Sequence, residues 1–214
     1  MASRTSLQRT LSIICLFAPA FACTPETPQG EARAPALFET CAACHGARGE
    51  GNREYEAPAI AGLEAWYVRA QLEKFQAGSR GAHPDDAAGL RMRPMSRTLR
   101  TREDVALMAD YVASLAPVST AAEMPGDPAR GEPLFTTCVQ CHGEKARGNP
   151  DKGAPALHRA SDWYLVAQLK KFKAGVRGTH PDDLTGAQMR PMALGLSDEQ
   201  AMRDVVAYIG TLSD

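Results

Sequence analysis

The chain has 214 residues, of which 44% are hydrophobic and 23% are charged, and its formal net charge is −1. These values are ordinary for a globular protein, and the balanced charge gives no indication of a nucleic-acid partner. The length suits one large domain or two small ones, and small domains often depend on a metal or cofactor. The six cysteines would predict disulfides in an exported protein, unless their spacing assigns them to something else.

The first 22 residues have the pattern of an export signal. Two arginines are their only charges, and the apolar run 11–21 follows them. This run is shorter than the roughly 20 residues that a transmembrane helix needs. Ala20 and Ala22 supply small residues at the −3 and −1 positions of a cleavage site. We therefore expect residues 1–22 to be a signal peptide and the protein to be periplasmic.

The segment after the cleavage site, residues 23–36, is rich in Pro, Gly and Glu and is expected to be flexible. It begins with Cys23, and its start resembles the lipobox of bacterial lipoproteins, in which the cysteine is acylated. Ala20 stands where a lipobox usually has Leu. Two interpretations stay open: a lipid anchor on Cys23 that holds the protein at a membrane, or ordinary cleavage that leaves a thiol at the new N-terminus.

The remainder of the chain is a tandem repeat without gaps, because Cys41 recurs as Cys138, an offset of 97 residues. The other repeated motifs are Trp-Tyr at 66–67 and 163–164, Gln-Leu at 71–72 and 168–169, Arg-Gly-x-His-Pro-Asp-Asp at 80–86 and 177–183, and Met-Arg-Pro-Met at 92–95 and 189–192. A duplicated domain explains this pattern, with units at 37–116 and 134–214. Residues 117–133 contain four prolines and two glycines and are expected to form a linker.

The periodicity within each unit is helical, and no alternating strand pattern stands out. A first helix is expected near 35–44 and near 132–141, and it leads into a Cys-x-x-Cys-His motif. A second helix carries aromatic residues in both units and should end at Gly78 and at Gly175, which are good C-caps.

A third helix is expected from about 101 to 115 and from 197 to 212, where Ser197 and Gln200 form a capping box. Proline interrupts the Met-Arg-Pro-Met segment, which we therefore expect to be a loop. The predicted fold class is all-α: two small domains in series, each with about three main helices and loops rich in Gly and Pro.

The Cys-x-x-Cys-His motifs at 41–45 and 138–142 carry the chemistry. This spacing is typical of covalent haem attachment, with thioether bonds from Cys41, Cys44, Cys138 and Cys141 and with His45 and His142 as proximal iron ligands. A four-cysteine zinc site would leave both histidines unexplained. A redox dithiol would need a βαβ context, which the sequence lacks. We therefore expect two covalently bound haem c groups.

A closed haem iron needs a second axial ligand. The residues repeated in both halves that qualify are Met92 or Met95 with Met189 or Met192, and His83 with His180. A thioether suits the low-spin iron of an electron carrier, and His/Met ligation raises the potential. Both histidines precede Pro-Asp-Asp in what reads as a polar turn facing solvent.

From about residue 34 to the end, these motifs resemble the class I c-type cytochromes and, among dihaem members, the cytochrome c4 type. In that family the ligand methionine stands about two helical turns before the Leu that opens the final helix. Counting back from Leu99 and Leu196 implies Met92 and Met189, with Met95 and Met192 as packing residues.

The resemblance implies further roles. Pro58 and Pro155 match the proline whose carbonyl accepts a hydrogen bond from the proximal histidine, which fixes the orientation of the ring. The aromatic residues Trp66, Tyr67 and Phe75, with their twins, would line the haem pockets. Four loop arginines could pair with haem propionates or be solvated: Arg80, Arg93, Arg177 and Arg190. One departure is that Gly62 has Arg159 as its counterpart, which could alter the loop near the second haem.

With two closed irons, the protein would carry single electrons between redox partners and would not be an enzyme. A quinol-linked reductase and a terminal oxidase are sensible partners. The alternatives are a cytochrome subunit of a larger redox enzyme, or a dihaem enzyme such as a peroxidase, which would need an open distal site. The resemblance also implies that the domains pack about a pseudo-twofold axis. The composition of the halves is nearly balanced and shows no strong steering field.

Overall fold

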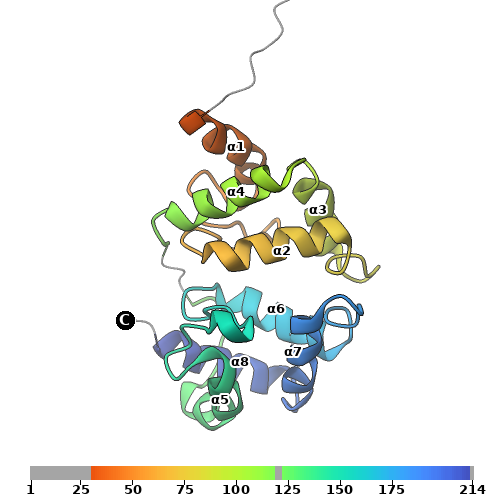
Figure 1. Cartoon of the computed structure of the whole chain (residues 1–214). Coiled ribbons are helices and arrows are strands. Elements are labelled where there is room, and N and C mark those ends of the chain that lie inside the picture. The colour runs from red at the N-terminus through yellow and green to blue at the C-terminus, as the bar shows by residue number, and fades with distance from the viewer. Residues whose placement is uncertain (1–29, 119–121, 213–214) are drawn as a thin grey trace, which may run out of the picture.

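The computed structural model describes residues 30–118 and 122–212, so the predicted signal peptide and Cys23 lie outside the described residues. Each half of the described chain is a small helical domain, and apart from two isolated bridges no strand is formed in these ranges (Figure 1). The first domain contains η1 (Gly30–Ala32), α1 (Arg33–His45), α2 (Ala65–Ala77), α3 (Ala87–Ser96) and α4 (Arg102–Ser114). The second contains α5 (Pro128–His142), η2 (Pro150–Lys152), α6 (Asp162–Lys173), α7 (Leu184–Leu194) and α8 (Glu199–Thr211). The predicted all-α fold with two domains is confirmed.

Helix α4 shows how the sequence builds the first core. Thr101 and Asp104 form a capping box, in which each side chain accepts a hydrogen bond from the backbone of the other. Apolar residues then recur at helical spacing and point to one side, against α1 and α2. The buried residues of this core are Phe38, Leu72, Leu99, Val105, Met108 and Val112.

The second domain repeats this arrangement, with α5 packed closely across α8. A glycine permits the close crossing, because a Cβ on Gly131 would collide with the carbonyl oxygen of Asp204. The first domain has Ala34 at the equivalent position, so its two helices cannot approach as closely. The core residues of the second domain are Phe135, Ala146, Val166, Leu196, Ala201, Met202, Val205, Val206 and Ile209.

The prediction that Met-Arg-Pro-Met is a loop was wrong in both domains, because these residues lie in α3 and α7. A proline past the first turn removes one hydrogen bond and crowds the carbonyl four residues before it, but its φ is compatible with a helix, so the helix can continue past it. Pro94 lies two residues before the end of α3. The helix begins at a cap, where the side chain of Asp86 accepts a hydrogen bond from Gly89 N at 3.0 Å.

Four boundaries also differ from the expected ones. Helix α5 begins at Pro128, inside the segment expected to be a linker, because Asp127 caps it and proline suits the first helical position. The described part of the expected flexible segment is helical from residue 30. The cap of α8 is Asp198 and not Ser197, since the Asp198 side chain accepts from Ala201 N. Gly78 is the C-cap of α2 as expected, whereas the C-cap of α6 is Ala174, one residue before Gly175.

The two domains stack along one direction, with α2 and α6 facing each other at the boundary (Figure 1). The α1–α4 pair and the α5–α8 pair lie on the far sides of this boundary. None of the helices in the described ranges is long and apolar enough to cross a membrane.

Candidate haem sites

Each Cys-x-x-Cys-His motif forms the last turn of the first helix of its domain. The helix ends directly after the histidine, where Gly46 and Gly143 adopt positive φ angles of 82° and 77°. The chain then turns back, so that a proline carbonyl faces the imidazole. The Nδ1 atom of His45 lies 2.8 Å from Pro58 O, and that of His142 lies 2.8 Å from Pro155 O.

These contacts fix the histidine tautomer. A carbonyl oxygen only accepts, so Nδ1–H must donate to it, and Nε2 is left with a lone pair for a metal. Burial lowers the pKa of His45 and His142, an effect that the hydrogen bond to the proline carbonyl partly offsets. Both rings are therefore held neutral and in the orientation that an axial ligand needs.

The cysteines do not fit a redox dithiol or a shared zinc site. Burial, with the neighbouring Cys44, raises the pKa of Cys41 to about 11, and burial also raises the pKa of Cys138. A redox dithiol would require the opposite shift, towards thiolate. Within the described ranges, no three Cys, His, Asp or Glu side chains come together as a metal site, so the two motifs do not form a shared zinc site.

Met92 and Met189, the expected distal ligands, pack toward the interiors of their domains. Met92 packs against the first core together with Cys41. Met189 lines a single cavity with Cys138, Cys141 and His142. Met95 and Met192, which we expected to be packing residues, are 38% and 39% exposed, although Met192 also lines that cavity. The two methionines of each pair are three residues apart on a helix and so lie on neighbouring parts of one face, but their burial differs: Met92 and Met189 are half-buried, whereas Met95 and Met192 are exposed.

Several buried donors have no protein partner and suit the acidic edge of a haem. The Nε atoms of Arg93, Arg177 and Arg190 are buried without a hydrogen bond, and so is Nε1 of Trp66. An unpaired buried donor costs roughly 1–3 kcal/mol, so such groups normally meet an acceptor. A propionate supplies acceptors, and the residues present therefore fit two haem groups. The thioether carbons would bond the four cysteines, and each group would supply one-electron chemistry.

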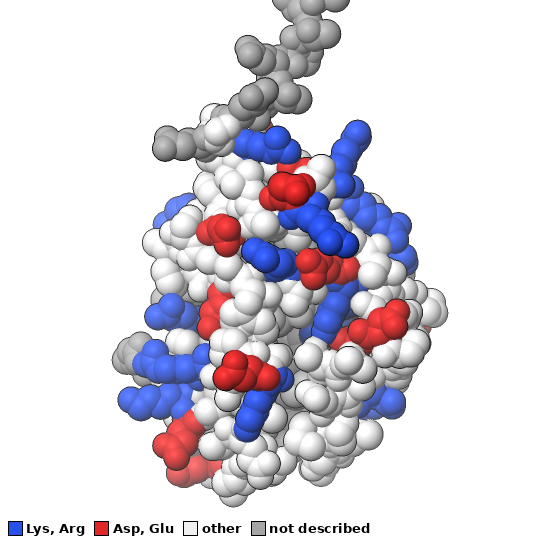
Figure 2. Space-filling view, viewed as in Figure 1, with Lys and Arg blue, Asp and Glu red and all other residues white. Residues whose placement is uncertain are grey.

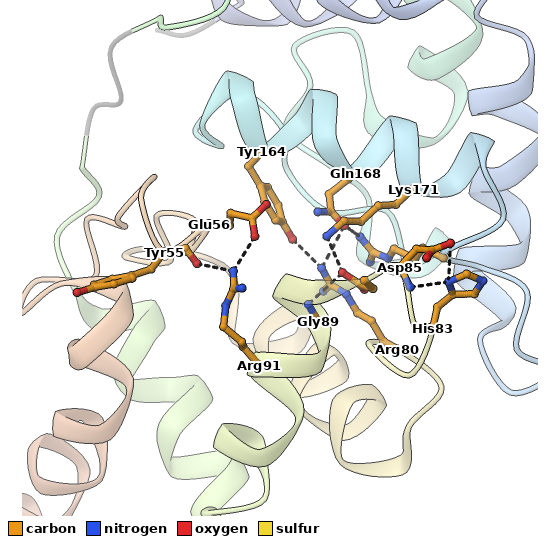
Figure 3. Close-up of polar contacts among 12 residues, drawn as sticks. Tyr55, Glu56, Arg80, His83, Asp85, Gly89, Arg91, Tyr164, Gln168 and Lys171 are labelled. Atoms are coloured by element: carbon orange, nitrogen blue, oxygen red, sulfur yellow. Dashed lines mark hydrogen bonds and ion pairs between the residues drawn. The ribbon is translucent and has the colours of Figure 1, made fainter.

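Arg80 and Arg177 also have a role that the sequence did not reveal, because both cross the boundary between the domains. Arg80 donates hydrogen bonds to Tyr164 Oη at 2.8 Å and to Gln168 Oε1 at 3.3 Å, as Figure 3 shows. Arg177 donates to Gln71 Oε1 at 3.1 Å in the reciprocal direction. Tyr67 and Gln71 of the first domain line the cavity of the second, so the second haem site is completed by residues from across the boundary.

Two ion pairs flank this network with the same symmetry. Lys74 Nζ contacts Asp183 Oδ1 at 2.5 Å, and Lys171 Nζ contacts Asp86 Oδ1 at 2.6 Å. These four residues are twins under the 97-residue offset, since Lys74 corresponds to Lys171 and Asp86 to Asp183. The pseudo-twofold packing implied by the resemblance is therefore present. The only signal for this packing in the sequence was that both copies retain the same lysine and aspartate.

Two smaller expectations concern the loops. His83 and His180 remain at the surface, with side chains 37% and 42% exposed, and each Nδ1 accepts a hydrogen bond from a backbone N–H two residues later. Gly62 has a positive φ of 72°, whereas Arg159 does not adopt a positive φ. The loop backbone therefore differs between the two domains at this position.

Two helical domains, each with a Cys-x-x-Cys-His motif and a proline-held histidine, define a duplicated haem-binding protein of the c type. The chain belongs to the cytochrome c family, whose model matches residues 31–116 and again 128–213. It carries two covalently bound haem c groups, one on Cys41 and Cys44 and one on Cys138 and Cys141.

Individual relatives agree with this assignment. The chain is 34% identical over 205 residues to the thiosulfate dehydrogenase electron acceptor of Thiomonas intermedia, with 91% of this chain and 87% of that protein covered. Cytochrome c4 of Pseudomonas stutzeri is similar in structure, with a TM-score of 0.65, 25% identity, and 85% and 98% covered. Thiosulfate dehydrogenase (TsdBA) of Marichromatium purpuratum gives a TM-score of 0.66 at 32% identity, over 84% of this chain and 40% of that one. The expected resemblance to cytochrome c4 is confirmed, and the chain is a dihaem electron-transfer cytochrome.

Proposed function

We propose that both irons are closed by a histidine and a methionine, so that the protein exchanges single electrons and binds no substrate at iron. His45 and Met92 would ligate the first iron, and His142 and Met189 the second. The observation that carries this proposal is that a methionine pair lines one cavity with His142 and both cysteines of its motif, and that Met189 is the more buried member of the pair. The twin position, Met92, faces the equivalent core. Pro58 and Pro155 would hold the proximal histidines through their carbonyl oxygens.

The donor and the acceptor of the electrons determine the direction of electron flow. We propose a periplasmic carrier that accepts electrons from a quinol-linked reductase or a sulfur-oxidising dehydrogenase and passes them to a terminal oxidase. The similarity to an electron acceptor of thiosulfate dehydrogenase supports the second kind of donor. If the chain is instead a subunit of a larger redox enzyme, the enzyme will co-purify with it, while the electron-transfer chemistry stays the same.

An absorption spectrum of the purified holoprotein tests the ligand set. We expect two low-spin haems per chain and, in the oxidised state, the weak far-red band that accompanies ligation of iron by methionine. Closed sites should also leave the reduced spectrum unchanged when carbon monoxide is added. A high-spin signal from one haem, with turnover of hydrogen peroxide, would contradict the carrier and favour a dihaem peroxidase.

We also propose that export exposes Cys23 at the mature N-terminus, where it is acylated and tethers the protein to a membrane. The support is the sequence pattern of residues 1–22, followed by a segment rich in Pro and Gly. Mass spectrometry of the N-terminal peptide from membranes should find a lipid on Cys23. An unmodified Cys23 in a protein released by osmotic shock would show ordinary cleavage instead.

A further inference from the structure

The repeat lets each surface residue be compared with its twin, and one segment departs strongly from the symmetry. In the first domain the end of α3 and the start of α4 carry Arg97, Arg100 and Arg102, all exposed. The twins in the second domain are Leu194, Ser197 and Glu199. Charge balance over each half hides this difference, because carboxylates elsewhere in the first domain compensate for the arginines.

These arginines line two adjoining hollows of the surface. The first, of about 440 Å³, is lined by Leu90, Arg93, Pro94, Arg97, Thr98 and Arg100, with no carboxylate. The second, of about 650 Å³, shares Arg97 and Arg100, adds Arg102, and has one lining carboxylate, Glu73. Figure 2 shows Lys and Arg side chains gathered over this end of the first domain. We call the segment 90–102, with its two hollows, the arginine face.

The backbone of the arginine face is held in place by the end of α2. Gln76 Nε2 donates to Ser96 O and to Leu99 O, each at 2.9 Å. Arg97 in turn donates from Nε and Nη2 to Gln76 O, at 3.3 and 3.1 Å. Arg100 and Arg102 have no ion pair among the described residues, so their charges face outward. A fixed loop loses little conformational freedom when a partner binds.

The arginine face lies beside the first haem site. It includes most of α3, which also carries Met92, and contains the apolar side chains of Leu90 and Met95, 40% and 38% exposed. Arginine together with exposed apolar side chains is the composition favoured at protein interfaces. Small, charged and transient interfaces are typical of electron-transfer pairs.

We propose that the arginine face is the docking surface for an acidic redox protein, which exchanges electrons through the first haem. This proposal rests on the electron-carrier function above, and it adds where one partner binds and what charge that partner has. The second domain lacks these three arginines, and its own cations at this end are engaged within the domain: Lys170 pairs with Glu199, and Lys173 donates to the carbonyl oxygens of Leu196 and Ser197. It also exposes Leu184 and Leu194, so a partner of a different kind would use it. The two domains thus have separate partners although their haem sites are alike.

Titration of the reduced, isotope-labelled holoprotein with a zinc-substituted, acidic blue-copper protein tests the proposal by nuclear magnetic resonance. We expect the amide shifts to be concentrated at residues 90–102. The variant R100Q/R102Q should weaken binding about tenfold at low salt. The control R69Q/K145Q removes the same net charge from exposed positions elsewhere and should bind as the wild type does.

Three results would overturn the proposal: shifts centred on the second domain, equal weakening in both double variants, or binding of anionic lipid vesicles but not of the acidic protein. The proposed function is judged separately, from the far-red band of the same samples. A variant that keeps both low-spin haems and loses binding supports the docking surface. If the wild type lacks the far-red band, the proposed ligand set is wrong. The docking proposal is then still decided by the positions of the amide shifts.

Discussion

Replacement of Met92 by alanine is expected to remove the far-red band of the first haem and to leave that of the second unchanged. Met92, like Cys41, packs against the first core, and as the proposed distal ligand its loss would open one iron only. Axial ligands tune haem reduction potentials over about 0.8 V. The reduction potential of the first haem should therefore fall by a few tenths of a volt, as an order of magnitude. A redox titration followed by absorbance would resolve this as one shifted and one unshifted wave.

The matched control is Met95→Ala, three residues along the same helix. Its side chain is 38% exposed, whereas that of Met92 is half-buried, so both waves should stay in place. Loss of the band in Met95→Ala, with an unchanged Met92→Ala, would reverse the ligand assignment. Met189→Ala, with Met192→Ala as its control, repeats the test on the second haem.

Replacement of Asp86 by alanine is expected to lower the free energy of unfolding by about 2–4 kcal/mol. The change leaves Lys171, whose side chain is only 20% exposed, without its partner in the other domain. It also removes the cap of α3, where Asp86 accepts from Gly89 N. Denaturant unfolding, followed separately by haem absorbance and by circular dichroism, should show this loss and a less cooperative transition. Asp85→Ala removes the neighbouring carboxylate, which is 79% exposed, and should change stability by less than about 0.5 kcal/mol.

The same carboxylate gives the contact between the domains a pH dependence. Burial alone would raise the pKa of Asp86, but the hydrogen bond and charge of Lys171 outweigh it, and the pKa lies below its usual value. A carboxyl with a lowered pKa stabilises the folded state above its unfolded pKa of about 3.9, and this contribution is lost as the pH falls through the folded pKa. The difference in stability between wild type and Asp86→Asn should therefore shrink below about pH 4. A constant difference down to pH 2 would contradict this account.

The sequence was most informative where function depends on fixed spacing. The Cys-x-x-Cys-His motifs predicted the haem groups, and the 97-residue offset predicted the duplication. The glycine after α2 predicted the end of that helix. The proline carbonyls facing both histidines came from the resemblance to a known family, and the structure places them 2.8 Å from Nδ1.

Other features depend on contacts that no local pattern encodes. The helical conformation of α3 was missed because a proline usually ends a helix, whereas here it lies in the last turn. The pairing of Lys74 with Asp183 was missed because a lysine on a helix and an aspartate in a turn normally face solvent. Only their retention in both copies could have indicated that they share a role.

The reciprocal contacts across the boundary have a consequence for the origin of the molecule. Each of these contacts across the boundary occurs twice, with the two halves exchanged: Lys74 pairs with Asp183, and their twins Lys171 and Asp86 pair with each other. Such a surface is self-complementary, which is the geometry of a homodimer with a twofold axis. Joining two copies of one gene would preserve every such contact while making the two copies a single chain. Selection could then keep the shared surface constant and let the outer faces diverge. Arg97, Arg100 and Arg102 in one half, opposite Leu194, Ser197 and Glu199 in the other, show that divergence.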